Sequence, residues 1–372
     1  MKALLQWFDD RTGLGPAVKQ CWDRPMPGKA CCCKVWPSAI LFAFCTQAIT
    51  GFFLWVYYSP SRQTAWESVY YLQHQVAGGW LLRAIHHYSA HVLLALLICY
   101  LLQMIVTGAY RAPRELVFWA ALGMAMCALA AMLTGDLLCW DRNGYASTLV
   151  RTGFLTLLPG IGDSLFPLAI GGPPPDLGHL AITRFFALHA GLFSAAFLLL
   201  SVLHGILLRR AGAKQCATAQ VVTRLWPEQA FLNSAACLLV LAVVLVLACQ
   251  HSVTGDHAGA ALGSPASSDP ADRYEAARPE WFLLGVYEFS HLFPGEWAVV
   301  PIFVVPGLLF GLLLAMPFIA QWRVGQIFNV AIVLVLLIAV VLLSYHSMAK
   351  DAADPKYRAA VAGEKRQAER VG

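Results

Sequence analysis

Five histidines lie inside two long apolar stretches of this 372-residue chain, residues 84–109 and 181–208. Ionisable or ligating side chains are costly inside such stretches and usually have a function there. In the second stretch His189 and His204 are 15 residues apart, which places them roughly 60° around a helix and about 22 Å along it. Two histidines near one face but at opposite depths predict two stacked sites rather than one.

The first stretch supplies a partner at each depth. His86 is expected at the depth of His189, and the residue 14 positions later is Tyr100, about 21 Å deeper along the helix. Tyr100 therefore stands opposite His204, where a second histidine would complete the site. Two further histidines of this stretch point away from this face, and we expect them to make polar contacts with a neighbouring helix or subunit: His87 and His91.

This pairing of histidines predicts a haem site. Two imidazoles from two helices of an apolar bundle commonly hold the iron of haem b, because neutral imidazole is a good iron ligand and the bundle interior is dry. Zinc would require three or four ligands at one depth, and each depth offers two. We therefore predict His86 and His189 as the iron ligands of one haem b. The second site retains His204, with Tyr100 as its partner.

The elements that position these residues are predicted to be membrane-spanning helices. The chain is 59% hydrophobic and only 13% charged, about half the charge of a soluble domain. A helix needs about 20 apolar residues to cross a bilayer, and seven runs meet this condition: 38–58, 84–109, 115–138, 181–208, 230–250, 298–320 and 327–348. We predict an all-α membrane protein of seven transmembrane helices, an N-terminal four-helix bundle followed by three C-terminal helices.

The lysines and arginines of the connecting segments predict the orientation. With the N-terminus inside, the inner segments hold 13 basic residues and the outer loops hold seven. This arrangement places two long connections, 139–180 and 251–297, outside together with the C-terminal tail. We expect a multi-pass protein of the bacterial inner (cytoplasmic) membrane, with a cytoplasmic N-terminus and a periplasmic C-terminus.

Four regions follow from this layout. Residues 1–37 form an interfacial N-terminal segment, 38–225 the four-helix haem b bundle, 226–348 the three-helix domain and 349–372 a polar tail. Ten of the 11 cysteines lie inside spans or on the inner side, so they do not form a disulfide framework. Membrane lipid is the expected surrounding, and no nucleic-acid partner is expected.

Several motifs resemble those of the cytochrome b subunit of quinol:cytochrome c (or plastocyanin) oxidoreductases. They are QAITG at 47–51, RAIH at 83–86, TGAYRAPREL at 107–116, TG at 134–135, WDRNGY at 140–145, ITRFFALH at 182–189 and RPEWF at 278–282. The likeness covers nearly the whole chain. It is strongest to the plastid-type four-helix cytochrome b followed by its three-helix partner subunit, whose histidine spacing is also 15 residues.

The resemblance implies two b haems, one near each membrane face. For the outer haem it implies His86 and His189 as ligands and Arg83 as the basic partner of the propionates. It also implies close packing of the porphyrin against backbone at Gly51 and Gly135, where the missing Cβ leaves space. The outer site is therefore complete.

The inner haem site differs from the family at nearly every position. Only His204 remains, while four expected residues, a histidine, two glycines and an arginine, are replaced by Tyr100, Pro37, Ala121 and Gln103. We expect the inner haem to be lost, or remodelled as a five-coordinate or tyrosine-ligated haem. The plastid-type form also binds an extra haem through one cysteine, and a covalent haem near Cys31–Cys33 stays open beside the simpler interpretation of three interfacial thiols.

The RPEWF segment resembles the family's Pro-Glu-Trp-Tyr motif at the quinol-oxidation pocket. Quinol oxidation releases protons, so a carboxylate at the pocket is needed as acceptor, and we predict Glu280 for this role, flanked by Pro279 and Trp281. Phe282 replaces the usual tyrosine. Two further residues are predicted to contact a cofactor or quinone: Arg184 and Tyr145.

These features together predict the membrane electron-transfer subunit of a bacterial cytochrome bc-type complex, a quinol:cytochrome c oxidoreductase. It would oxidise quinol at the outer pocket and pass an electron to the outer haem, without the standard quinone cycle if the inner haem is missing. The implied partners are a Rieske iron–sulfur protein, a cytochrome c subunit and a second cytochrome b in a dimer or heterodimer. Two alternatives stay open: a membrane-anchor cytochrome b of a formate dehydrogenase or hydrogenase, and a structural or assembly paralogue.

Overall fold

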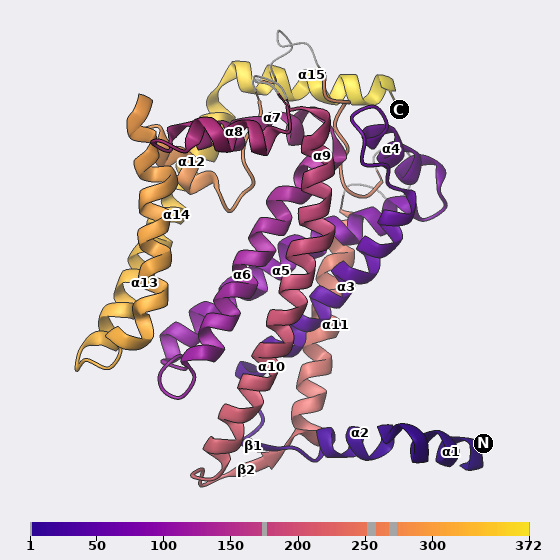
Figure 1. Cartoon of the computed structure of the whole chain (residues 1–372), viewed down its shortest axis with the longest axis vertical. Helices are drawn as coiled ribbons and strands as arrows, with labels where there is room; N and C mark the ends of the chain where they lie inside the picture. The colour runs from indigo at the N-terminus through magenta and orange to yellow at the C-terminus, as the bar shows by residue number, and fades with distance from the viewer. Residues whose placement is uncertain (1, 173–176, 251–257, 268–273, 275, 372) are drawn as a thin grey trace.

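Seven helical segments span the long axis of the molecule in the computed structural model (Figure 1). The structure describes the chain except residues 1, 173–176, 251–257, 268–273, 275 and 372. Within the described residues, the segments long and apolar enough to cross a membrane are Trp36–Tyr57, Gly79–Thr107, Glu115–Cys139, His179–Cys216, Leu225–Cys249, Gly295–Ile319 and Gly325–Ala353. The predicted all-α class and seven spans are confirmed.

The spans are built from helices whose ends follow local sequence rules. The main ones are α3 (Trp36–Tyr57), α5 (Gly79–Thr107), α6 (Glu115–Asp136), α9 (His179–Phe186), α10 (Ser194–Cys216), α11 (Ala230–Cys249), α13 (Val305–Ile319) and α14 (Gly325–Ala353). A π-helical turn, η4 (Ala187–Phe193), joins α9 to α10. Gly78 and Gly108 flank α5 in the left-handed conformation, which glycine adopts without steric cost.

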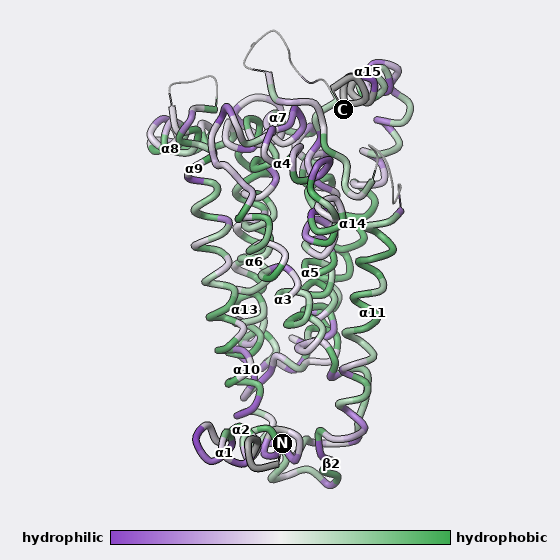
Figure 2. The backbone as a smooth tube through the Cα atoms, turned by 90° about the vertical axis from the view of Figure 1, so that its right-hand side faces the viewer, coloured by the Kyte–Doolittle hydropathy of each residue, from purple (hydrophilic) through white to green (hydrophobic). Residues whose placement is uncertain are grey.

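The two ends of the bundle carry different elements. The upper end in Figure 1 holds α4 (Ala65–Gln75), α7 (Arg142–Gly153), α8 (Gly162–Ile170), α12 (Leu284–Ser290) and the C-terminal helix α15 (Pro355–Val371). The lower end holds α1 (Lys2–Thr12), α2 (Leu14–Trp22) and a two-stranded antiparallel ribbon of β1 (Pro25–Pro27) and β2 (Val222–Arg224). The chain termini therefore lie at opposite ends, as an odd number of spans requires. Figure 2 shows hydrophilic residues gathered at both ends and a hydrophobic band between them.

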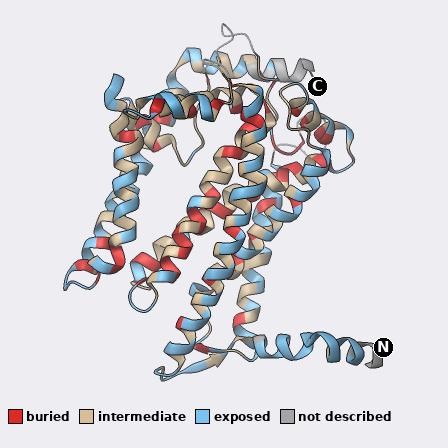
Figure 3. Cartoon of the chain, viewed as in Figure 1, coloured by how far each residue is buried: buried red, intermediate tan, exposed pale blue. Residues whose placement is uncertain are grey.

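The tightest packing lies among the first four spans. Buried side chains of α3, α5, α6 and α10 form one cluster, which Figure 3 shows as the densest group of buried positions. Its largest fully buried members include Tyr110, Phe118, Ile40 and Leu97. In the fourth to seventh spans few side chains are buried within the chain, so their apolar surface must be covered by lipid or by other subunits.

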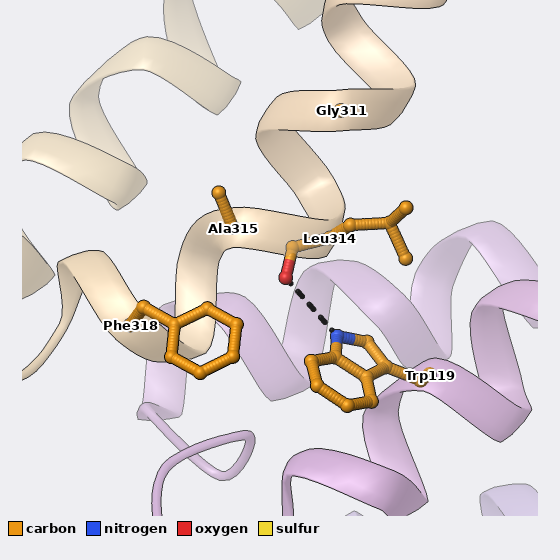
Figure 4. Close-up of a pocket in the computed structure, with 5 residues that line it drawn as sticks. All are labelled: Trp119, Gly311, Leu314, Ala315 and Phe318. Atoms are coloured by element: carbon orange, nitrogen blue, oxygen red, sulfur yellow. Dashed lines mark hydrogen bonds between the residues drawn. The ribbon is translucent and has the colours of Figure 1, made fainter.

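The last two spans meet the first bundle at a few polar contacts near the lower end. Asn329 of α14 donates to the Tyr110 hydroxyl at 2.7 Å, and that hydroxyl donates to Gln326 Oε1 at 2.7 Å. Gln326 in turn donates to the Ile105 carbonyl at the end of α5. On α6, the Trp119 indole donates to the Leu314 carbonyl of α13 at 3.1 Å, beside an apolar hollow (Figure 4). These contacts fix α13 and α14 against α5 and α6.

A segment of small residues, 258–267, covers the upper end of α5. Its buried members include Ala258, Ala260 and Ser264. Gly259 has φ +79°, and a Cβ there would lie 2.8 Å from the Trp80 carbonyl oxygen. Only glycine therefore fits where this segment crosses α5. The sequence pattern did not indicate that this part of the long connection is buried.

The cysteine-rich segment at the lower end departs from expectation. Cys31 and Cys33 form a disulfide, which leaves Cys32 as the free thiol of the three. This disulfide corrects the interpretation of three free interfacial thiols, and eight other cysteines whose side chains are described are free. With two of its thiols joined to each other, this segment offers one cysteine rather than three for a covalent haem.

Candidate functional site

His86 of α5 and His189 of the π-helical turn η4 face each other inside the bundle. Their ring centres are 6.2 Å apart and the rings are inclined by 69°. Two imidazoles that bind one metal ion from opposite sides, each with a bond of about 2 Å, hold their ring centres about 6 Å apart. The space between the two rings therefore matches one metal ion, and we call these two residues the upper site.

The segment 47–51 of α3 holds His86 in place. Gln47 Nε2 donates to the His86 carbonyl at 2.6 Å. Thr50 Oγ1 donates to the Thr46 carbonyl at 2.7 Å and lies 2.9 Å from His86 Nδ1. Since the threonine hydrogen is used by Thr46, Thr50 accepts a hydrogen bond from Nδ1–H. The unprotonated Nε2 of His86 is then the nitrogen that can bind a metal.

His189 is oriented in the same way. Its Nδ1 lies 2.7 Å from the Ala131 carbonyl oxygen of α6, and only a protonated Nδ1 can donate to a carbonyl. Nε2 is again left as the metal-binding nitrogen. The histidine lies in a π-helical turn, a local widening of the helix that often marks a functional position.

Two glycines stand directly behind the histidine rings. A Cβ at Gly135 would lie 2.7 Å from His189 Cε1, and a Cβ at Gly51 would lie 3.0 Å from His86 Cε1. Larger residues would push both rings out of their facing geometry. The ring separation, the paired tautomers and the two glycines fit a bis-imidazole haem b, which, when bound, accepts and passes on single electrons.

Arg83 lies one helical turn above His86 but is used by the protein itself. Its guanidinium donates to Gln73 Oε1, to the Ala260 carbonyl at 2.7 Å and to the Ala261 carbonyl at 3.0 Å. The side chain is buried under the segment 258–267. A role with haem propionates would therefore require Arg83 to exchange some of these carbonyl partners.

Tyr100 and His204 form the lower site, and they contact each other directly. The Tyr100 hydroxyl and His204 Nε2 share a hydrogen bond of 3.1 Å, and both residues are buried. A metal ion bound to both atoms would hold them about 4 Å apart, given bonds of about 2 Å. His204 Nε2, the nitrogen that would bind iron, is therefore hydrogen-bonded to the Tyr100 hydroxyl.

The surroundings of the lower site are packed with protein side chains. Ala121, where the family has a glycine, is fully buried in the core beside Tyr100. Phe44 and Phe197 stack at 4.4 Å in the same cluster. Gln103 donates to the Cys33 carbonyl at 3.2 Å rather than facing the Tyr100–His204 pair. This half of the bundle resembles a filled protein core.

A second group of charged residues lies at the upper end, between α6, α7 and the segment before α12. Arg151 of α7 contacts Glu280 at 2.5 Å and Asp136 at 2.6 Å. All three side chains are at most one quarter exposed. Glu280 Oε2 is buried and has no hydrogen-bond partner among the described residues. Burial raises the pKa of the Glu280 carboxyl, although the Arg151 guanidinium acts in the opposite direction.

Two further contacts hold the segment that carries Glu280. Arg278 makes a bidentate pair with Asp351 at the end of α14, with distances of 2.8 to 3.1 Å. The Trp281 indole donates to His91 Nδ1 of α5 at 3.1 Å. The RPEWF segment is thus tied to α14 by Arg278, to α7 by Glu280 and to α5 by Trp281.

Several predicted site residues lie elsewhere. Arg184 donates to the Leu168 carbonyl of α8. The Tyr145 hydroxyl accepts from the Leu177 amide at 3.3 Å, and its ring packs near Trp140. Phe282 packs edge-on against the Trp281 ring. The structure brings none of these three into contact with His86 or His189, so their predicted cofactor or quinone contacts stay predictions.

Sequence reasoning missed Asp136 and Arg151, and it predicted a polar contact for His91 without identifying Trp281 as the partner. Asp136 directly follows Gly135, and Arg151 is one of the seven basic residues of the outer loops. The sequence gives a partial indication of their contact, because Ser147 and Arg151 are four residues apart and share one helix face. Both contact Asp136 in the structure.

The fold and the upper site define a multi-pass membrane protein built to hold haem between helices. The family model described as "Cytochrome b/b6/petB" matches residues 22–212, and the chain belongs to this cytochrome b/b6 family of electron-transport proteins. Family membership implies that it binds haem b.

Individual relatives agree with this assignment. The chain is similar to cytochrome b6 of Auxenochlorella protothecoides, with 32% identity over 57% of this chain and 98% of the relative. It is also similar to the menaquinol:cytochrome c reductase cytochrome b subunit of Geobacillus thermodenitrificans, with 31% identity over 57% of this chain and 97% of the relative. A chain of a solved "Hyperthermophilic respiratory Complex III" matches 96% of this chain and 94% of its own length, with a TM-score of 0.77 and 24% identity. That structure supports the fold through all seven spans.

Proposed function

We propose that this chain is the membrane electron-transfer subunit of a cytochrome bc-type quinol:cytochrome c oxidoreductase. It oxidises quinol at the upper end and passes one electron to a haem b held by His86 and His189. The observation that carries the proposal is Glu280, whose buried Oε2 lacks a partner among the described residues and whose Oε1 contacts Arg151. A quinol hydroxyl can donate the hydrogen bond that Glu280 Oε2 lacks.

The chemistry at the pocket requires removal of two protons and two electrons from each quinol. Glu280 accepts one proton from a quinol hydroxyl, which its raised pKa favours, and the other proton is released to water at the upper end. Arg151 holds Oε1 so that Oε2 faces the donor, and Asp136 shares the arginine charge. One electron goes to the haem b, the other goes to an iron–sulfur protein of the Rieske class, and a cytochrome c subunit receives it in turn. The name of the Geobacillus relative supports a cytochrome c acceptor.

The lower site carries no second haem in this proposal. The direct Tyr100–His204 hydrogen bond and the filled core around it support this part. The chain alone then has one haem and no electron path across the membrane, so a standard quinone cycle would not operate within it. Pairing with a second, two-haem cytochrome b in a heterodimer would supply the missing path.

The orientation belongs to the same proposal. The upper end, with Glu280 and α15, faces the periplasm, and the lower end, with α1 and α2, faces the cytoplasm. The excess of basic residues in the lower connecting segments supports this orientation.

Glu280→Gln in the assembled complex tests the proposal, with Glu296→Gln as the matched control. Glu296 is an exposed glutamate at the same end. Reduction of haem b by added quinol should slow about 10²-fold to 10⁴-fold in the first variant and stay unchanged in the second. An unaltered rate in Glu280→Gln would contradict the assignment of the proton acceptor.

A structural or assembly role without redox function is the second candidate, and the filled lower site favours it. His86→Leu separates the two. Loss of the b-type absorption spectrum is expected for the redox subunit, whereas a purely structural chain would show no such spectrum before the substitution. The membrane anchor of a formate dehydrogenase or hydrogenase is disfavoured, because the RPEWF segment with its Glu280–Arg151 contact has no use there.

A further inference from the structure

Within the described residues, a polar contact joins the segment that carries Glu280 to helix α5, which carries His86. The Trp281 indole Nε1–H donates to His91 Nδ1 at 3.1 Å, and the two residues are 190 positions apart. His91 is five residues after His86 on the same helix. The His87 ring packs edge-on against His91, with ring centres 4.9 Å apart, which limits the rotation of the His91 side chain.

Packing alone does not orient the Trp281 side chain. Trp281 is 47% exposed, so almost half of its surface makes no contact with the described residues. The hydrogen bond to His91 is the directional contact that the structure shows for the indole N–H. The indole therefore takes its direction mainly from His91.

The other two anchors of the segment do not reach α5. Arg278 binds Asp351 at the end of α14, and Glu280 binds Arg151 of α7. With these two alone, the segment could tilt relative to α5 while both ion pairs remain intact. Trp281–His91 is the contact that fixes the distance between the Glu280 backbone and the helix that carries His86.

We propose that His91 is a positioning residue for quinol oxidation. It holds Trp281 so that Glu280, the preceding residue, keeps its place relative to the haem ligand His86. The inference rests on the proposed function. His91 acts as the neutral tautomer with its proton on Nε2, because Nδ1 accepts the indole hydrogen.

The tautomer suggests a discriminating pair of variants. Asparagine carries a side-chain oxygen near the position of Nδ1 and can accept the same hydrogen bond, whereas leucine cannot. His91→Asn should therefore keep the function and His91→Leu should lose it. Tyr88→Phe is the matched control. The Tyr88 hydroxyl of the same helix accepts a hydrogen bond from Gln250 at 3.0 Å, so the substitution removes a polar contact of α5 that does not involve the RPEWF segment.

The test measures single-turnover reduction of haem b by a short-chain quinol in the assembled complex. We expect the rate constant of haem b reduction to fall roughly threefold to tenfold in His91→Leu, the equivalent of one lost hydrogen bond, and to stay within about twofold of the wild type in His91→Asn. Trp281→Phe should show the same loss, and the double variant His91→Leu/Trp281→Phe should be no slower than either single variant. Wild-type kinetics in His91→Leu, or multiplied losses in the double variant, would overturn the inference.

A second readout separates this inference from the proposed function. The indole N–H band of Trp281 in ultraviolet resonance Raman spectra reports its hydrogen bond, and subtracting the Trp281→Phe spectrum isolates it from the other 11 tryptophans of the chain. The band should shift in His91→Leu and not in His91→Asn. If quinol fails to reduce haem b in the wild type, the proposed function fails, while an unshifted band in His91→Leu refutes the His91 contact independently.

Discussion

Gly135→Ala is the most direct test of the upper site. The added Cβ would lie 2.7 Å from His189 Cε1 and 2.9 Å from Nδ1, closer than carbon atoms approach one another in packed proteins. Without haem the imidazole can rotate away from the methyl group. In the proposed haem-bound form, Nε2 would be tied to the iron and Nδ1 to the Ala131 carbonyl, so the ring could not move without breaking one of these bonds.

The size of the effect follows from this difference. Inserting a methyl group into a filled site costs about 1–3 kcal/mol, and here the cost falls on the haem-bound form. Haem affinity should therefore drop about 5-fold to about 150-fold. Alanine is also a better helix former than glycine by about 1 kcal/mol, but this gain is present with and without haem and cancels from the affinity.

Gly123→Ala is the matched control on the same helix. Its Cβ would lie 3.1 Å from the terminal methyl group of Leu200, a flexible side-chain end that can shift by a few tenths of an ångström. Gly51→Ala, at 3.0 Å from His86 Cε1, should have a smaller effect than Gly135→Ala. The assay is haem b content per chain, followed by titration of the haem-depleted protein with haem. Equal affinities in Gly135→Ala and Gly123→Ala would refute the proposed geometry of the upper site.

Three further results are expected. Pyridine haemochrome analysis should give one haem b per chain, and Tyr100→Phe should leave the haem spectrum unchanged; two haems per chain would contradict the filled lower site. The quinol oxidation rate should fall as pH drops through the raised pKa of Glu280, because the carboxylate must be unprotonated to accept a proton. Arg151→Met should move this fall to higher pH, because it removes the positive charge that lowers the pKa of Glu280. A pH profile that Arg151→Met leaves unaltered would argue against the Arg151–Glu280 contact. Asp351→Asn should lower the stability of the complex by about 1 kcal/mol, measured by thermal unfolding, since it removes a charge from the bidentate pair with Arg278; an unchanged midpoint would mean that water replaces the pair.

The fold was predictable because the membrane imposes strong rules. Hydropathy alone located all seven spans, and the 15-residue spacing of His189 and His204 set their depths. The QAITG segment could be recognised as part of a site, but its roles could not: Gln47 holds a backbone carbonyl and Thr50 sets a tautomer. Such roles depend on how two helices are rotated against each other, which spacing along one helix does not determine.

The contacts of the upper end were less predictable. Asp136 and Arg151 meet because a short helix, α7, folds back over the end of α6. The sequence predicts a polar contact for His91 but not its partner, which comes from a segment 190 residues later. The segment 258–267 shows no helix or strand periodicity, yet its small residues allow it to pack over α5. Sequence reasoning fails here because loops carry no periodic pattern.

The ribbon of β1 and β2 and the contacts around it bear on how the two parts of the chain are made. The family model matches residues 22–212, and the cytochrome b6 relatives cover 57% of the chain. The family match therefore spans α3 to most of α10 and ends before α11. Across that division, β1 pairs with β2, Trp22 stacks on Trp226 and the Cys31 amide donates to Gln229. These contacts would hold two separately synthesised polypeptides together. Joining them in one chain guarantees equal numbers of both parts at each round of translation.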